Sequence, residues 1–231
     1  MTKSLTSRFS RGLLLALVCV IAGILGLALG ARSPAAAASP VSLPPQSDEK
    51  SIEISERPDE LVEFRTLRLN DVEIAPNRKF SASALAAKSG GQVVDWIQNL
   101  QFSLRNRTDK RITYIGFELQ FPDTGATGPL MVYREFGIGI HPNAGTPAGA
   151  VLRNDVPLSL GPGETATAIL SADRLRRIKH FIGLRNFQLA DLSRVVVKVL
   201  NVFFDDGVMW STGHYYKPNI AAPGGYERID R

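Results

Sequence analysis

The chain has 231 residues, one cysteine and a formal net charge of +5 at pH 7. Four positive charges, on Lys3, Arg8, Arg11 and Arg32, precede the first acidic residue, Asp48, and removing them leaves +1 for the rest of the chain. The high isoelectric point therefore belongs mostly to the N-terminal segment and gives no indication of nucleic-acid binding.

Residues 1–38 have the three parts of a secretory signal. A basic start is followed by an uncharged apolar run over residues 12–30 and by a small-residue stretch that ends at Ala38, where we place the cleavage site. The apolar run approaches the length that spans a bilayer, so an uncleaved signal-anchor helix is the alternative. The only cysteine, Cys19, lies inside this run, which excludes disulfides and thiolate metal sites from the exported part.

The rest of the chain divides by composition into three parts. Residues 39–58 are rich in Ser, Pro, Glu and Asp and predict a disordered linker. Residues 59–216 carry the apolar alternation of one folded domain. Residues 217–231 are rich in Pro and Gly and predict a flexible C-terminal tail.

The first predicted strands come from alternation and turn residues. Residues 61–69 predict a strand, and Asn70-Asp71 offers a turn into a short return strand that begins at Val72. Residues 81–91 are compatible with one helical turn or with a loop. A later strand presents one apolar face, made of Trp96, Leu100, Phe102 and Leu104.

A hairpin is expected around the polar run 106–110, which predicts a tight turn between that strand and a return strand over residues 111–121. Residues 130–140 and 164–170 predict two further strands, the second of edge type. A helix should follow, capped by Ser171 and ending near Ile182. One face of this helix is apolar and consists of Leu175, Ile178 and Ile182.

The closing hairpin is predicted over residues 194–213. Val, Leu and Phe fill its first arm, and Asp206-Gly207 supplies the positive φ that a type I′ turn requires. Trp210 on the return arm should cover the opposite strand and enter the core.

These elements predict an all-β fold, an antiparallel sandwich of about seven to eight strands with one short helix, preceded by a hydrophobic N-terminal helix and a disordered tether. The run from Asp95 to Pro122 and the later run from Phe204 to Ser211 resemble motifs of uncharacterised exported bacterial proteins. This resemblance implies an immunoglobulin-like or fibronectin-like sandwich outside the cytoplasm, and it implies no activity.

The sequence offers one weak candidate metal site, made of Asp205, Asp206 and His214. Adding His141 would turn the same group into the acid and base of a metal-dependent hydrolase. Asp at a hairpin turn is ordinary turn chemistry, however, so we predict no catalytic residue, no metal and no cofactor.

A possible contact surface lies on the predicted helix and on the last strand. The dense basic run on the helix would attract an anionic lipid or an acidic partner, and two exposed rings could add to it. The surface consists of Arg174, Arg176, Arg177, Lys179, Tyr215 and Tyr216.

The leading hypothesis is a non-catalytic extracytoplasmic β-sandwich, periplasmic or secreted, that binds an envelope protein or a polysaccharide and binds no nucleic acid. Two alternatives stay open, namely the metal-dependent hydrolase and a membrane-anchored structural protein that packs with itself through an edge strand.

Overall fold

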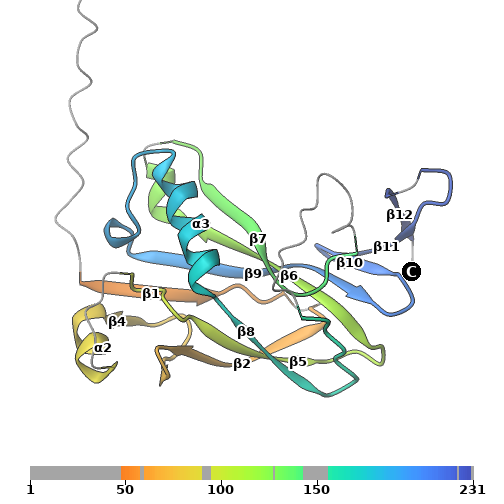
Figure 1. The fold of residues 1–231 in the computed structure, drawn as a ribbon, viewed down its shortest axis with the longest axis horizontal. Helices are drawn as coiled ribbons and strands as arrows, with labels where there is room; N and C mark the ends of the chain where they lie inside the picture. Colours follow the sequence, from red (N-terminus) through yellow and green to blue (C-terminus); the bar gives the residue numbers. More distant parts are fainter. Residues whose placement is uncertain are drawn as a thin grey trace, which may run out of the picture. The chain divides into compact units, whose positions relative to one another are not determined.

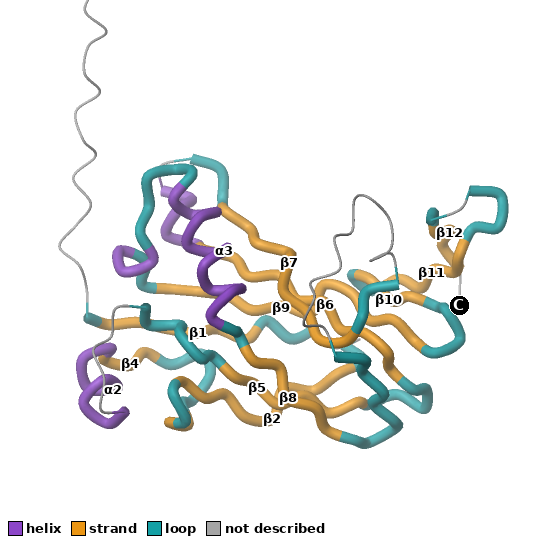
Figure 2. Tube along the Cα trace, in the orientation of Figure 1, coloured by secondary structure: helices purple, strands orange, loops and turns teal. Residues whose placement is uncertain are grey.

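The computed structural model describes residues 48–57, 60–89, 95–126, 128–142, 156–222 and 224–229. These residues form a mostly β fold with two sheets and two α-helices (Figures 1 and 2). The predicted N-terminal leader and apolar helix lie outside the described residues.

The larger sheet has eight strands and is built around β9, the longest strand of the fold. Strand β6 pairs along one side of β9 and carries β7 on its far side. The other side of β9 is shared, because β1 pairs with its first half and β10 with its second half. The strands are β1 (Glu49–Ile54), β4 (Lys79–Ser81), β6 (Ile112–Phe121), β7 (Met131–Gly139), β9 (Arg194–Phe204), β10 (Met209–Ser211), β11 (His214–Pro218) and β12 (Tyr226–Ile229).

The smaller sheet has four strands in the order β3-β2-β5-β8. They are β2 (Val62–Leu69), β3 (Val72–Glu73), β5 (Gln101–Asn106) and β8 (Thr165–Ile169). The predicted turn at Asn70-Asp71 is confirmed, since both residues have positive φ, 46° and 66°, and Leu69 pairs with Val72. The predicted edge strand is confirmed as well, because β8 is an outer strand of this sheet.

The core lies between the two sheets and is rich in aromatic rings. Phe102 of β5 meets Phe117 of β6 edge to face at 4.9 Å between ring centroids, and Phe136 of β7 lies 5.7 Å from Phe102. Such tilted and edge-to-face pairs add about 0.5–1.5 kcal/mol each beyond the area they bury. Trp96 and Trp210 are 2% and 1% exposed, so both rings belong to the core, as expected.

The hairpin predicted around residues 106–110 is wrong. Strand β5 pairs with β2 and β8, whereas β6 pairs with β7 and β9, so the chain crosses here from one sheet to the other. The crossing depends on Asn106, which is 1% exposed. Its amide nitrogen donates to Lys110 O (2.7 Å) and Leu160 O (3.0 Å), and its Oδ1 accepts from the backbone and hydroxyl of Thr108. Because the Asn106 side chain bonds to backbone groups of this segment, the segment does not depend on pairing between β5 and β6. Strand β6 can therefore pair with other strands.

The predicted linker is wrong for its second half, because Glu49–Ile54 is strand β1 and pairs in parallel with β9. Low apolar content suggested disorder, but only alternate residues of this strand need to be apolar, and Ile52 is fully buried. Lys50 is also buried, and its ammonium donates to Ala190 O (2.8 Å) and Leu192 O (3.0 Å). Burial lowers the pKa of Lys50.

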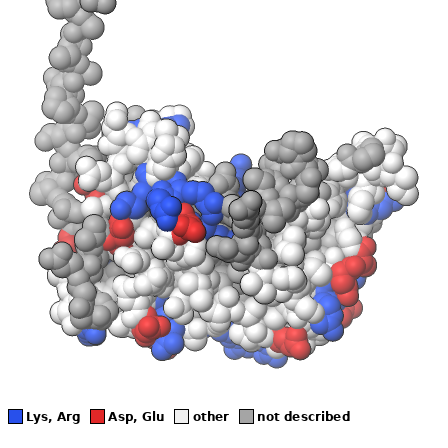
Figure 3. Space-filling view, in the orientation of Figure 1, with Lys and Arg blue, Asp and Glu red and all other residues white. Residues whose placement is uncertain are grey.

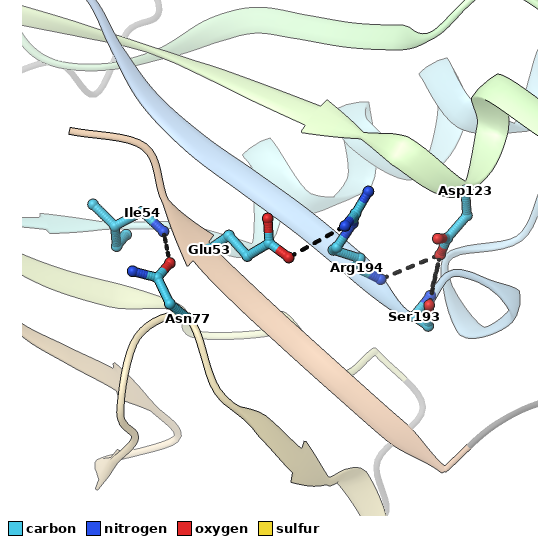
Figure 4. Close-up of polar contacts among 6 residues, drawn as sticks. All are labelled: Glu53, Ile54, Asn77, Asp123, Ser193 and Arg194. Atoms are coloured by element: carbon cyan, nitrogen blue, oxygen red, sulfur yellow. Dashed lines mark hydrogen bonds and ion pairs between the residues drawn. The ribbon is translucent and has the colours of Figure 1, made fainter. Parts of the chain in front are cut away.

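Hydrogen bonds fix both the strand β1 and the start of β9 (Figure 4). Asn77 Oδ1 accepts from Ile54 N at 2.8 Å, and Glu53 forms an ion pair with Arg194 at 3.4 Å. The carboxylate of Asp123 accepts from the hydroxyl of Ser193 at 3.0 Å and from Arg194 N at 3.2 Å. The 3₁₀ turn Pro122–Ala126 after β6 therefore holds the beginning of β9 in register.

The predicted flexible tail is wrong too. Strand β11 continues to Pro218, and β12 returns along it in antiparallel pairing. The intervening Gly-containing segment is a hairpin loop, in which Asn219 N donates to Gly225 O and Gly224 adopts a φ of 83°. A high Gly and Pro content is equally typical of a hairpin loop.

The fold also has more elements than expected. The described residues hold twelve strands instead of seven or eight, and two α-helices instead of one. The ambiguous segment 81–91 contains helix α2 (Ala82–Ser89). Asp48 caps this helix, since its carboxylate accepts from Ser83 N at 2.9 Å and from the Ser83 hydroxyl at 2.8 Å. The second helix, α3 (Ala172–Gly183), has the predicted Ser171 cap.

The closing hairpin β9–β10 is confirmed, but its turn is of another type. Gly207 N donates to Phe204 O, and Phe204 N donates to Val208 O. Gly207 has a φ of 79°, whereas Asp206 is not among the residues with positive φ. The loop therefore has three residues and ends in a left-handed glycine. The two-residue turn with positive φ at both positions lies one strand later, at Thr212-Gly213 (49° and 92°).

We expect Asn106→Ala to lower the free energy of unfolding by about 2–3 kcal/mol, because it removes the donors and the acceptor that hold the crossing. Urea unfolding followed by tryptophan fluorescence measures this. Gln101→Ala, a polar truncation on the same strand, is the control and should cost less than about 0.5 kcal/mol. Equal losses in the two variants would contradict the role of Asn106.

We expect Gly207→Val to destabilise the protein by about 1–3 kcal/mol, because a β-branched residue resists positive φ. Gly207→Asn is the matched control, since Asn tolerates the left-handed region, and it should keep most of the stability. Thermal unfolding of the two variants and the parent compares them directly. A valine variant as stable as the parent would refute the left-handed turn.

Candidate functional site: an arginine groove between two strand edges

A groove of about 940 Å³ opens between β7, β8 and the first turns of α3. The site lies where the two sheets present their outer strands, with α3 across the opening between them (Figures 1 and 2). We call it the arginine groove. It is lined by Gly137–Gly139 of β7, by residues 156–158, by Ala166, Thr167 and Ile169 of β8, and by Ser171–Arg174, Arg176 and Arg177 of α3.

Local sequence explains why α3 stands at this place. The side chain of Ser171 accepts from Arg174 N, and Asp173 in the first turn suits the positive end of the helix. Leu175, Ile178 and Ile182 are buried as predicted, which orients the helix. With that face against the core, the arginines at positions 174, 176 and 177 line the groove.

Each arginine has a different environment. The Arg174 guanidinium lies 5.3 Å from the ring of Phe136, over the buried core. Arg176 is exposed and forms an ion pair with Asp173 one turn earlier. Arg177 is half-buried, and its Nε is shielded from solvent without an acceptor among the described residues. Burying an N–H donor without a partner is costly. Of the three arginines, Arg177 would therefore gain most from a ligand that accepts a hydrogen bond from its Nε.

The groove combines positive charge with apolar surface. Among the described side chains that line the groove, three arginines face one carboxylate, that of Asp173, so these charges sum to +2. Figure 3 shows the Lys and Arg side chains gathered over α3. Like charges three residues apart on a helix repel each other, and Arg174 and Arg177 have this spacing. Val156 and Ile169 are 75% and 48% exposed. The site therefore suits an anionic ligand with some apolar surface.

The structure divides the contact surface predicted from the sequence. Arg174, Arg176 and Arg177 line the groove, but Lys179 pairs with Asp95 at 3.1 Å outside it. Tyr215 and Tyr216 lie on β11, where they pair with Trp210 and Met209 of β10. Both rings are half-buried, and neither lines the groove.

The structure does not gather the candidate metal ligands. No group of three or more His, Cys, Asp or Glu side chains in the described ranges could hold a metal ion. Asp205 and Asp206 belong to the turn before β10, whereas His214 begins β11 and pairs with Ser211 at the other end of β10. The imidazole of His141 packs against the rings of Tyr114 and Phe203, with 4.9 and 5.0 Å between ring centroids.

Two of these groups have perturbed pKa values with structural causes. Burial would raise the pKa of the Asp206 carboxyl, but hydrogen bonds from Lys110 and from Val208 N outweigh it, so the pKa is lowered. Burial lowers the pKa of His141, as expected for an imidazole among aromatic rings. The first group stabilises a turn, and the second packs against a sheet face.

Sequence reasoning missed half of the groove. The glycines of β7, the segment 156–158 and the outward residues of β8 gave no charge or motif signal. One sign was available for β8, because Ile169 places a large apolar side chain among exposed threonines. An exposed apolar residue on an edge strand is typical of a contact surface.

Comparison with known protein families, with curated proteins and with solved structures finds no match. The resemblance to uncharacterised exported proteins therefore stays a prediction. Within the described part of the chain, no helix combines the length and apolar character that crossing a bilayer requires.

We expect the arginines to differ in their effect on stability. Arg177→Met removes a buried donor that has no acceptor among the described residues and a positive charge three residues from Arg174, so its free energy of unfolding should stay within about 0.5 kcal/mol of the parent. Arg174→Met loses the contact with Phe136 and should cost about 1 kcal/mol. Urea unfolding at low salt measures both variants. A larger loss for Arg177→Met than for Arg174→Met would make Arg177 a structural residue.

Proposed function

We propose that this chain is an exported, non-catalytic binding module with an immunoglobulin-like sandwich, and that it holds an anionic partner in the arginine groove. The partner would be an envelope component, either a protein or a polysaccharide. The observation that carries the proposal is the collection of Arg174, Arg176 and Arg177 in one groove, where Asp173 is the one carboxylate among the described lining residues.

The energetics of the arginines support a binding role. A helix gains no stability from neighbouring like charges, and the half-buried Arg177 Nε lacks an acceptor among the described residues. Groups that cost stability in the free protein are typical of functional sites. An anion in the groove would accept from these donors and screen their repulsion, because charge-assisted hydrogen bonds are stronger than neutral ones.

The alternative of a metal-dependent hydrolase gains no support from the geometry. Its four residues would have to converge in one pocket, yet Asp206 pairs with Lys110 and His141 contacts Tyr114 and Phe203. These contacts serve the turn and the sheet face, so binding is the better proposal.

The proposal of export is based on the predicted leader over residues 1–38. The fate of this leader would decide where the module acts. Seventeen residues, 31–47, separate the apolar run over residues 12–30 from Asp48, the first described residue. Even fully extended, seventeen residues reach only about 60 Å. If the leader stays as a membrane anchor, the module would act close to the membrane surface; if the leader is cleaved, the module would be periplasmic or secreted.

The proposal predicts that an acidic probe binds through the groove. With a fluorescein-labelled ten-residue peptide containing five glutamates, we expect the variant with Arg174, Arg176 and Arg177 replaced by Gln to lose at least tenfold in affinity. Ion pairing also predicts that binding to the parent weakens as NaCl rises from 50 to 500 mM. Fluorescence anisotropy measures both effects.

The matched control replaces three exposed arginines outside the groove, Arg65, Arg68 and Arg107, by Gln. It has the same net charge as the groove variant and should lose less than threefold. Equal losses would show that binding follows net charge alone. Failure of the glutamate peptide, of alginate and of phosphatidylglycerol vesicles to bind at 50 mM NaCl would overturn the proposed function.

A further inference from the structure

The outer edge of β8 presents to the groove backbone groups that have no partner among the described residues. Leu170 N donates to Leu100 O and Asn106 N donates to Glu164 O, which fixes the residues of β8 that bond to β5. In an antiparallel pair the bonding direction alternates along the strand. Thr165, Thr167 and Ile169 therefore direct their N–H and C=O groups away from β5, where no strand of the described residues pairs with them.

This edge lacks several of the features by which proteins protect exposed strands. Short length, charged residues, proline and bulges block the pairing of an edge with another chain. Strand β3 has only two residues, β4 carries Lys79, and β12 carries Glu227 and Arg228. Strand β8 reads Thr-Ala-Thr-Ala-Ile, with no charge, no proline and a continuous register against β5.

The open edge and the arginines belong to one site, because Thr167 and Ile169 line the same groove as Arg174, Arg176 and Arg177. We infer that the partner is an extended acidic peptide segment, which adds a strand to the outer edge of β8 while its carboxylates bind the arginines. This inference rests on the proposed function and specifies its ligand. Backbone hydrogen bonds would supply affinity, and the arginines would select for acidic residues.

Charge distinguishes this partner from a second copy of the chain. A second β8 would satisfy the same backbone groups, but the strand contains no carboxylate to neutralise the arginines. An alternation of acidic and apolar residues fits better. Successive side chains of a strand point to opposite faces, so one side would offer carboxylates while the other covers exposed apolar surface such as Ile169.

The test uses two synthetic peptides of one sequence, labelled Thr-Glu-Val-Glu-Thr-Glu-Val-Glu. In the second peptide, alternate backbone nitrogens on one edge are methylated, which removes donors and blocks pairing but keeps every charge. We expect anisotropy titrations of the parent protein to show at least tenfold weaker binding of the methylated peptide. The protein variant Thr167→Pro should cause a similar loss, because the proline removes an outward N–H without disturbing the bonds to β5.

The outcomes separate this inference from the proposed function. Equal binding of both peptides, still lost when Arg174, Arg176 and Arg177 become Gln, would overturn strand addition and leave the anion site. Arginine-dependent binding of phosphatidylglycerol vesicles in place of the peptide would identify a lipid surface and overturn the peptide partner. A dimer of the free protein in light scattering, dissolved by Thr167→Pro and insensitive to the peptide, would assign the edge to self-association and also overturn it.

Discussion

The buried amide of Asn106 holds the two sheets in the arrangement on which the rest of the structure depends. Its side chain bonds to Thr108 and Lys110, within the segment between β5 and β6, and to Leu160. Its own backbone bonds to Gly163 and Glu164, just before β8. One residue thus fixes the crossing between sheets and the start of the open edge. A buried, fully hydrogen-bonded polar residue of this kind specifies one arrangement among several that have similar apolar packing.

The groove follows from this crossing. Because β5 and β6 belong to different sheets, β8 can end one sheet while β7 ends the other, and an opening is left between them. Helix α3 crosses this opening, with Leu175, Ile178 and Ile182 against the core. The arginines beside that apolar face then line the opening. The packing of the helix determines where the arginines lie. The topology of the sheets determines that the edges of β7 and β8 lie beside them.

Features that depend on a few neighbouring residues were predictable from the sequence. The Ser171 cap, the buried face of α3 and the turn at Asn70-Asp71 each result from local chemistry. Pairing between distant segments was not. The polar run after Asn106 reads as a hairpin turn, but its side chains bond within the segment and the strands on either side find partners elsewhere. Likewise β1 is a strand only because β9 and β4 lie beside it. The arginines could be recognised as a cluster in the sequence. The open edge of β8 beside them could be recognised only from the order of the strands in the structure.

Residue-resolved hydrogen exchange with and without the unmethylated acidic peptide is the most direct measurement. In the free protein the amides of Thr165, Thr167 and Ile169 should exchange quickly and those of Ala166 and Ala168 slowly, because only the latter bond to β5. Saturation with the peptide should slow the three outward amides at least tenfold and leave the other two unchanged. Outward amides that still exchange quickly at saturation, or protection that appears at another strand edge, would contradict the account.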